Sequence, residues 1–146
     1  MKTRVSILIK RTSLLYDKIS NQLLTPYDLT SSQFKILMVL YTSPVESVRQ
    51  ADIETRFALS NPTVTGLIQK LEAKGLVQKM PHPEDKRSRF LVLTEAALAM
   101  EAEMRALGNQ IEAQMAQGLS EAEYDQLAQL LEKMLVQNGI GNFAGE

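Results

Sequence analysis

Apolar residues recur at helical spacing along most of the chain, which predicts a mainly α-helical protein. A first helix is expected over Val5–Leu24, because apolar positions return between charged ones until Pro26 ends the pattern. A second helix is expected from Ser31 to about Tyr41, before the break at Ser43-Pro44. A third, short helix fits Gln50–Phe57.

The stretch from residue 60 to residue 75 predicts the second helix of a helix-turn-helix. Ser60 or Asn61 is suited to cap its start, and Pro62 fits the first turn, where its missing N–H is not needed. Gly75 is a C-terminal stop signal. The apolar stripe has the spacing i, i+3, i+4, i+7 and consists of Val64, Leu67, Ile68 and Leu71.

Two short β-strands follow directly and predict a wing. Leu76–Met80 and Arg89–Leu93 have the composition of strands, and residues 81–88 between them read as a polar loop. Three helices followed by a strand, a loop and a strand are typical of a winged helix-turn-helix. The winged core is therefore expected at residues 30–94.

Long helices are expected beyond the wing. Thr94 can cap a helix that runs to about Gln117, where a glycine ends it. Ser120 and Glu123 have the spacing of a capping box, so a last helix is expected from there to about Gln137.

The helices outside the winged core have apolar faces that a compact winged domain alone leaves uncovered. Residues 1–25 and 95–138 are therefore expected to form a helical dimerisation region within a single domain of residues 1–146. A two-fold homodimer would hold two recognition helices about 34–36 Å apart, one turn of DNA. Residues 139–146 are expected to be a flexible tail.

Charge is distributed unevenly, although the net charge of the 146 residues is only −1. Residues 1–94 carry 14 lysines and arginines against 8 acidic residues, whereas residues 95–146 carry 2 against 9. This asymmetry favours a protein whose basic residues, 1–94, include a surface that faces nucleic acid. Chance surface composition is the alternative.

The composition argues against several kinds of chemistry. With no cysteine and one histidine, the chain has no disulfide framework, thiolate zinc site or cysteine nucleophile. It lacks a glycine-rich phosphate loop and a metal-ligand cluster, so no enzyme activity, catalytic residue, cofactor or metal is expected. No segment approaches the roughly 20 apolar residues of a membrane span. A cytoplasmic protein without membrane partners is expected.

The helix expected within residues 60–75 has a face opposite its apolar stripe, and this face is the candidate DNA-reading surface. Asparagine and glutamine can pair with adenine in the major groove, and threonine can contact a thymine methyl group or a phosphate. An ordinary solvated helix face is the alternative. Glycine within a helix costs about 1 kcal/mol relative to alanine, so Gly66 indicates close approach to DNA or to a neighbouring helix. The candidate residues are Ser60, Asn61, Pro62, Thr63, Thr65, Gly66, Gln69 and Lys70.

The tip of the wing carries a second set of candidate DNA contacts. Asp85 lies two residues before Arg87, close enough to orient a guanidinium group that can enter a narrow minor groove. Lys86 and Arg89 are expected to contact phosphates. A basic tip that is merely solvated is the alternative, and His82 is expected to be a solvent-exposed loop residue.

The order and spacing of several segments resemble the MarR-type (multiple antibiotic resistance regulator) family. The resemblance runs from about Leu29 to Thr94. It includes Leu29-Thr30-Ser31-Ser32-Gln33-Phe34, Leu59-Ser60-Asn61-Pro62-Thr63-Val64-Thr65-Gly66-Leu67-Ile68, Lys70-Leu71-Glu72-Ala73-Lys74-Gly75-Leu76-Val77, Asp85-Lys86-Arg87-Ser88-Arg89 and Val92-Leu93-Thr94. Two positions depart from the family pattern: Ala97 stands where glycine is frequent, and Glu54 stands where a small apolar residue is common.

This resemblance implies an obligate dimer that binds double-stranded DNA at pseudo-palindromic operators and often responds to small anionic or aromatic compounds. By the same resemblance, Arg87 is the wing arginine and Asp85 is its positioning partner. The expected function is a sequence-specific transcriptional regulator, a repressor that responds to a small-molecule effector whose site is unknown. The alternative is a winged-helix protein–protein interaction module, against which the basic tip and the polar helix face argue.

Overall fold

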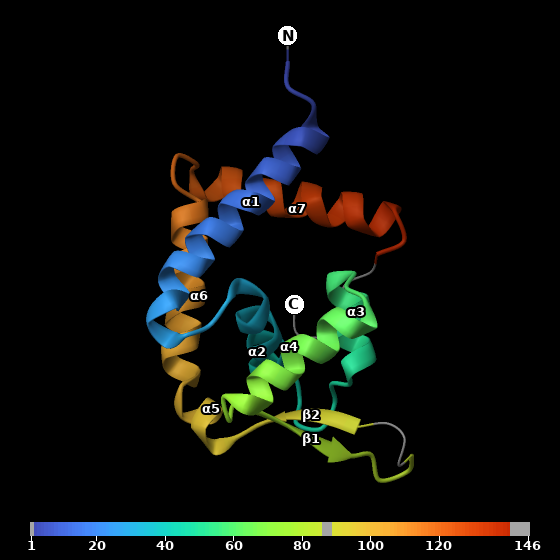
Figure 1. Ribbon diagram of the computed structural model, residues 1–146. Coiled ribbons are helices and arrows are strands. Elements are labelled where there is room, and N and C mark those ends of the chain that lie inside the picture. The colour runs from blue at the N-terminus through green and yellow to red at the C-terminus, as the bar shows by residue number, and fades with distance from the viewer. Residues whose placement is uncertain (1, 86–88, 141–146) are drawn as a thin grey trace. The chain divides into compact units, whose positions relative to one another are not determined.

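The computed structural model describes residues 2–85 and 89–140, and helices form most of this part of the chain (Figure 1). The elements are α1 (Val5–Leu24), the 3₁₀ turn η1 (Thr25–Tyr27), α2 (Ser31–Thr42), α3 (Gln50–Phe57), α4 (Asn61–Ala73), β1 (Val77–Pro81), β2 (Arg89–Leu93), α5 (Glu95–Ala99), α6 (Glu101–Met115) and α7 (Glu121–Gln137). They divide into a helical unit, residues 2–31 and 106–140, and a winged unit, residues 32–85 and 89–105. No helix among the described residues is both long and apolar enough to cross a membrane.

Most of the predicted elements are present within a residue or two of their expected ends. α1, α3 and β2 have the predicted bounds, and α2 and β1 each end one residue later than expected. The mainly helical winged fold predicted from the sequence is confirmed.

The single long helix predicted after Thr94 is wrong, because the structure has two helices, α5 and α6, with a turn at Met100 between them. Thr94 does cap the first one, since its Oγ1 accepts a hydrogen bond from the Ala97 N–H at 3.2 Å. The Ala97 carbonyl oxygen accepts from the buried hydroxyl of Tyr41. It also accepts from the Met100 N–H at 3.1 Å, which is the spacing of a tight turn. The Tyr41 side chain, which is distant in the sequence, thus donates to the Ala97 carbonyl oxygen close to the point where the helix is interrupted.

The core of the winged unit is built from the apolar stripes of its helices and one side of its hairpin. Three positions of the predicted α4 stripe, Val64, Ile68 and Leu71, are fully buried, while Leu67 is half-buried. They share this core with Phe34, Ile36, Leu37, Ile53, Val77 and Leu91.

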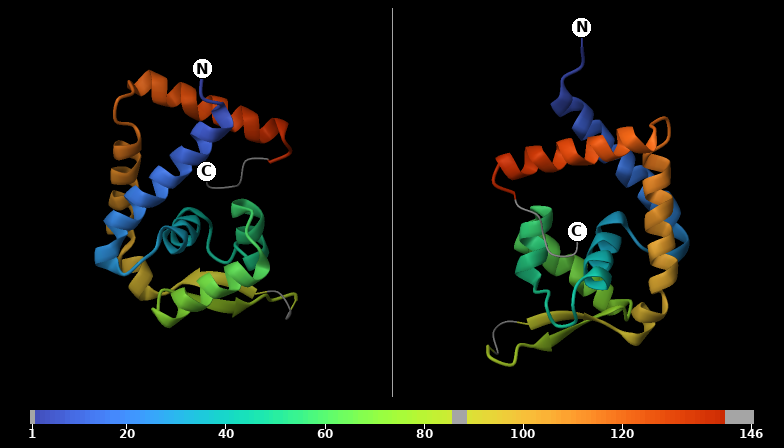
Figure 2. Two further views of the ribbon diagram at one scale, coloured as in Figure 1. Left: turned by 45° about the horizontal axis from the view of Figure 1, so that its top comes forward. Right: turned by 180° about the vertical axis from the view of Figure 1, so that it is seen from behind.

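The hairpin is tied to the start of α3 as well as paired with itself. β1 and β2 are antiparallel, with Val77 opposite Leu93 and Pro81 opposite Arg89. The Leu91 N–H donates to the Val48 carbonyl oxygen at 2.8 Å, and the next residue, Arg49, forms a bridge with Phe90. In both views of Figure 2 the hairpin lies beside α4. Backbone hydrogen bonds therefore hold the hairpin at the start of α3, and the hairpin lies beside α4. Its position relative to both helices of the helix-turn-helix is fixed in this way.

In the helical unit, α7 begins and ends with capping structures. The predicted capping box is confirmed: the Glu123 N–H donates to Ser120 Oγ at 3.1 Å, and the Ser120 N–H donates to Glu123 Oε1 at 2.9 Å. These hydrogen bonds lower the pKa of Glu123. At the other end, Gly139 has φ of 82°, and the Ile140 N–H donates to the Leu135 carbonyl oxygen at 2.9 Å. The rest of the predicted tail, residues 141–146, lies outside the described residues.

The buried hydroxyl of Tyr41 predicts that stability falls at alkaline pH. Burial, together with the Glu101 carboxylate, raises the pKa of Tyr41 to about 12 from its ordinary value of 10.0. Because the folded state keeps this proton longer than the unfolded chain, the free energy of unfolding should fall as pH rises from 10 towards 12.

Tyr41→Phe should remove part of that fall and lower stability at neutral pH by about 0.5–1.5 kcal/mol through the lost hydrogen bond. Only part of the fall should disappear, because the pKa of Tyr124 is also raised to about 12. Urea unfolding at a series of pH values measures both effects. Identical pH slopes for the two proteins would contradict the assignment.

Candidate nucleic-acid interface

The start of α4 determines which polar side chains are left to contact a ligand. Ser60 is the cap: its Oγ accepts from the Thr63 N–H at 3.4 Å and forms a 2.9 Å hydrogen bond with the Thr63 hydroxyl. Pro62 lies in the first turn as predicted. Of the two residues that could have capped the helix, Asn61 is not used, so its amide is available for other contacts.

The side of α4 opposite the buried stripe carries the predicted reading residues. Because Val64, Ile68 and Leu71 face the core, the positions between them turn outward. Thr65 and Gly66 are half-buried. The exposed members of the set are Ser60, Asn61, Pro62, Thr63, Gln69 and Lys70.

Gly66 is not required by packing within the chain. A Cβ built at this position meets no heavy atom within 4 Å beyond the helix's own backbone and immediate neighbours. The explanation that Gly66 lets a neighbouring helix approach closely is therefore unsupported in this structure, and its close approach to DNA stays a prediction.

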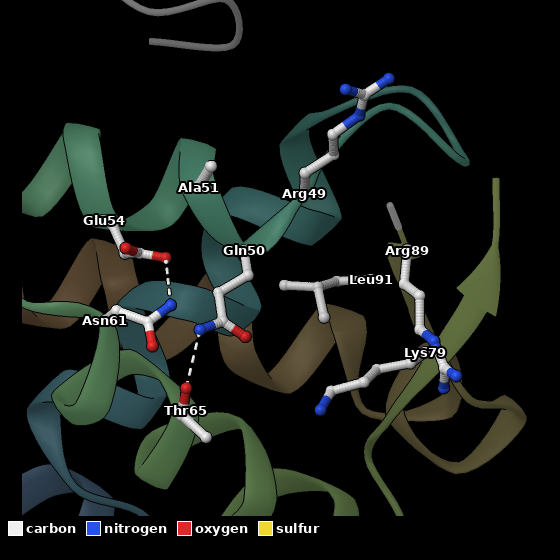
Figure 3. Close-up of a pocket in the computed structure, with 9 residues that line it drawn as sticks. All are labelled: Arg49, Gln50, Ala51, Glu54, Asn61, Thr65, Lys79, Arg89 and Leu91. Carbon is white, nitrogen blue, oxygen red and sulfur yellow. Dashed lines mark hydrogen bonds between the residues drawn. The ribbon is translucent and has the colours of Figure 1, made fainter. Parts of the chain in front are cut away.

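A cavity of about 490 Å³ opens between α3, α4 and the hairpin (Figure 3). Two hydrogen bonds between side chains join α3 to α4 along it. Gln50 Nε2 donates to the Thr65 hydroxyl at 2.8 Å, and Asn61 Nδ2 donates to Glu54 Oε2 at 3.3 Å. The residues that line it are Arg49, Gln50, Ala51, Glu54, Asn61, Thr65, Lys79, Arg89 and Leu91.

Cationic side chains stand at the hairpin side of this cavity. Figure 3 shows Lys79 and Arg89 extending from the two strands, across Leu91 from the amides of α3 and α4. Lys79 Nζ lies 3.7 Å from Glu72 Oε1. The guanidinium carbon of Arg49 lies 5.6 Å from the centre of the Phe90 ring. The cavity thus combines hydrogen-bonding amides with positive charge, as a nucleic-acid surface requires.

Six of the lining residues were not predicted as site residues, and four of these six are polar or charged: Arg49, Gln50, Glu54 and Lys79. Gln50, Glu54 and Lys79 belong to elements that the sequence predicts, and Arg49 directly precedes α3, but the sequence does not show that the start of α3 meets the hairpin. The pairing of Arg49 with Phe90, which brings these elements together, leaves no periodic signal in either segment.

The predicted wing residues are described only in part. Arg89 is exposed at the start of β2, and Asp85 is exposed on the loop. Lys86 and Arg87 lie outside the described residues, so the pairing of Asp85 with Arg87 stays a prediction.

His82 lies on the loop between the strands as predicted, but the prediction that it is solvent-exposed is wrong. Its side chain is half-buried, with its ring centre 4.7 Å from that of Phe90, and its Nδ1 accepts from the Glu84 N–H at 3.0 Å. An aromatic side chain on β2 gives the imidazole an apolar surface that the loop sequence alone does not reveal. Within the part of the chain that the structure describes, no group of three or more acidic or histidine side chains is placed to hold a metal ion.

Comparisons with known proteins agree with this geometry. A model of the MarR family matches residues 29–88. The HTH-type transcriptional regulator SarZ of Staphylococcus haemolyticus (strain JCSC1435) is 30% identical over 115 residues, which are 79% of this chain and 76% of the relative.

Two solved structures are similar over nearly the whole chain. The MepR–DNA complex of S. aureus has a TM-score of 0.82 at 26% identity, and covers 93% of this chain and 99% of MepR. Bordetella bronchiseptica BpsR, solved in a study of the regulation of its DNA binding by 6-hydroxynicotinic acid, has a TM-score of 0.79 at 29% identity. That match covers 90% of this chain and 92% of BpsR. The winged fold, the segments that resemble the family and these relatives lead to one conclusion: the chain belongs to the MarR family of winged helix-turn-helix regulators.

Proposed function

We propose that this protein is a sequence-specific DNA-binding transcriptional regulator that acts as a homodimer. The observation that carries the proposal is the cavity beside α4, where exposed amide and hydroxyl groups lie next to the cations of the hairpin. Amides and hydroxyls can read base edges in the major groove, and arginine and lysine side chains can neutralise phosphates.

Double-stranded DNA fits this surface better than a protein partner does. Protein interfaces are typically depleted of lysine and centred on apolar or aromatic side chains, whereas this cavity has Leu91 as its one large apolar lining residue. The MepR relative was solved as a DNA complex, and the similarity covers 93% of this chain. In this proposal α4 enters the major groove, while Asp85, Lys86, Arg87 and Arg89 act at the minor groove and the phosphates.

The helical unit supports the proposed homodimer. α1 and α7 border an apolar groove of about 870 Å³ whose lining includes Leu8, Leu127, Leu130 and Met134. Leu130 is 54% exposed and Leu8 is 45% exposed. Apolar surface of this extent on a soluble chain indicates a protein contact, and a second copy of the same unit would cover both grooves by symmetry. The segments 1–25 and 95–138 are the proposed dimerisation region.

The proposal includes regulation by a small molecule, since BpsR is a relative whose DNA binding is regulated by 6-hydroxynicotinic acid. Repression that an effector relieves is the proposed mode, with the effector and its site left open. No enzymatic activity is proposed, because the relatives compared are regulators. A cytoplasmic location is part of the proposal, because DNA is the proposed partner.

Salt dependence tests whether DNA is the partner. Each phosphate that a cation neutralises contributes about −0.9 to the slope of log K against log salt concentration. Affinity for duplexes selected from a random pool should therefore fall steeply with salt, and Arg89→Ala should make the slope shallower by about one unit per protomer.

Lys18→Ala, which removes an exposed cation of α1 that lines neither the DNA-facing cavity nor the apolar groove, is the matched control and should leave the slope unchanged. Fluorescence anisotropy titrations at several salt concentrations give these slopes. A flat dependence for the wild-type protein would rule out the proposed function.

Gly66→Ala separates the folding and binding roles of this position. Because an added Cβ meets no neighbour, alanine should stabilise the protein by about 0.5–1 kcal/mol through the better helix propensity. The same methyl group should weaken DNA binding about tenfold if the helix backbone approaches the bases. Urea unfolding and anisotropy measure the two effects separately, and unchanged affinity would show that DNA does not approach Gly66.

Leu130→Glu tests the dimer on the full-length chain. Leu130 is largely exposed in one chain, so glutamate there should cost the single chain little, whereas at a covered dimer contact it buries a charge. The dimer dissociation constant should rise about tenfold or more. Gln129→Glu adds the same charge to an exposed position of α7 that does not line the groove, and should leave the dimer intact. Sedimentation equilibrium distinguishes these results, and equal dissociation constants would remove the groove from the interface.

A further inference from the structure

The hydroxyl of Thr65 on α4 is engaged by a side chain of α3. Gln50 Nε2 donates to its Oγ1 at 2.8 Å, and both side chains are half-buried and line the cavity (Figure 3). Two other helical threonines differ, because Thr12 and Thr42 donate to the carbonyl oxygen four residues earlier, at 2.7 and 2.8 Å. The Thr65 hydroxyl is therefore turned towards α3, whereas theirs are turned to their own helices.

The direction of this hydroxyl determines where the methyl group of Thr65 lies, because both groups are carried by the same Cβ. Threonine on a helix divides between two χ1 rotamers, and an exchange of rotamers moves the methyl group to another side of the Cβ. The hydrogen bond with Gln50 selects one of the two. In Figure 3 the methyl group of Thr65 points away from Gln50. The next residue, Gly66, adds no side chain beside it.

Gln50 is presented from a fixed part of the backbone. It is the first residue of α3, and the residue before it, Arg49, pairs with Phe90 of the hairpin. A half-buried side chain on a paired segment has fewer conformations to lose than a fully exposed one, so its hydrogen bond costs less entropy. The contact is thus suited to restrain Thr65.

We propose that Gln50 is a positioning residue that makes Thr65 read the methyl group of a thymine. The inference rests on the proposed function and adds a base preference to it. A threonine on a reading helix can contact the C5-methyl group of thymine through its own methyl group, and thymine is the base that carries a methyl group in the major groove. In the rotamer that Gln50 selects, the Thr65 methyl group meets a thymine at one position of each half-site.

Replacement of thymine by deoxyuridine removes only the methyl group of the base and tests the proposal with the full-length protein. Duplexes that the wild type selects from a random pool supply the operator, and each thymine is then replaced in turn in both half-sites. At one position the thymine duplex should bind about tenfold more tightly, since one buried methyl contact is lost in each half-site. Fluorescence anisotropy gives this ratio of dissociation constants, the methyl ratio.

Gln50→Ala should lower the methyl ratio at that position to about twofold. The freed hydroxyl of Thr65 can then bond to the carbonyl oxygen of Asn61, four residues earlier, as those of Thr12 and Thr42 do in their helices. This rotation moves the methyl group away from the thymine. Thr65→Ser keeps the hydroxyl and lacks the methyl group, so it should abolish the difference between the two duplexes.

Thr65→Val separates positioning from direct contact. Its side chain has methyl groups at both γ positions and one dominant rotamer on a helix, so a methyl group meets the thymine with or without Gln50. The methyl ratio should stay at about tenfold, and adding Gln50→Ala should not change it. Thr55→Ala, which truncates an exposed residue of α3 that does not line the cavity, is the control and should leave the wild-type ratio unchanged.

The possible failures are distinguishable, because a loss of folded protein lowers binding to both duplexes alike and leaves the methyl ratio unchanged. If the wild type enriches no common sequence, the proposed function fails and the inference fails with it. If the wild type selects an operator but no thymine is sensitive, or Gln50→Ala keeps the wild-type ratio, the inference alone is wrong. If Gln50→Ala lowers the ratio in the Thr65→Val background as well, Gln50 contacts the thymine itself and is not a positioning residue.

Discussion

The burial of one face of α4 is the constraint on which the proposed interface depends. Val64, Ile68 and Leu71 are completely inaccessible to solvent, and truncating such residues to alanine typically costs about 2–5 kcal/mol. Total stabilities of small domains are about 5–15 kcal/mol, so rotation of α4 about its axis would remove much of the folding free energy. The residues between the buried positions must therefore face outward.

Affinity and specificity are assigned to different elements around the cavity. Lys79 and Arg89 come from the hairpin, where their charges attract phosphates of any sequence. Asn61 and Thr65 come from α4, where amide and hydroxyl groups can distinguish base edges. The hydrogen bond from the Leu91 N–H to the Val48 carbonyl oxygen fixes the hairpin relative to the start of α3. Because of this link, a contact made by the hairpin also restricts where α4 can lie on a duplex.

Local signals in the sequence predicted most of the fold, because they act within a few residues. The capping box of Ser120 and Glu123 and the α4 stripe could be found this way. The break at Met100 has no such local signal; the Ala97 carbonyl oxygen beside it accepts from the hydroxyl of Tyr41, which is 56 residues away in the sequence. The half-burial of His82 could not be found either, because this loop residue packs against Phe90 of β2.

The candidate site was predictable to a similar extent. Helix periodicity identified the outward face of α4 and all of its candidate reading residues, because that face follows from the position of the stripe. Periodicity does not show which of those side chains are already engaged by α3. The contact of Glu54 with Asn61 joins two helices across a turn, and neither helix carries a pattern that predicts it.

A single winged unit offers few side chains for reading DNA. The apolar groove of the helical unit therefore bears on recognition, because a dimer formed through it would provide two winged units. Each good base contact contributes about 1–3 kcal/mol of discrimination, and one α4 can make only a few of them. Specific binding exceeds non-specific binding by about 4–10 kcal/mol, which is more readily reached when two copies read two half-sites. In the proposed homodimer, joining the copies in advance through α1 and α7 would also spare the second copy most of the entropy cost of binding alone. The exposed apolar face of α7 would thereby raise the sequence discrimination that the proposed reading helix α4 can achieve.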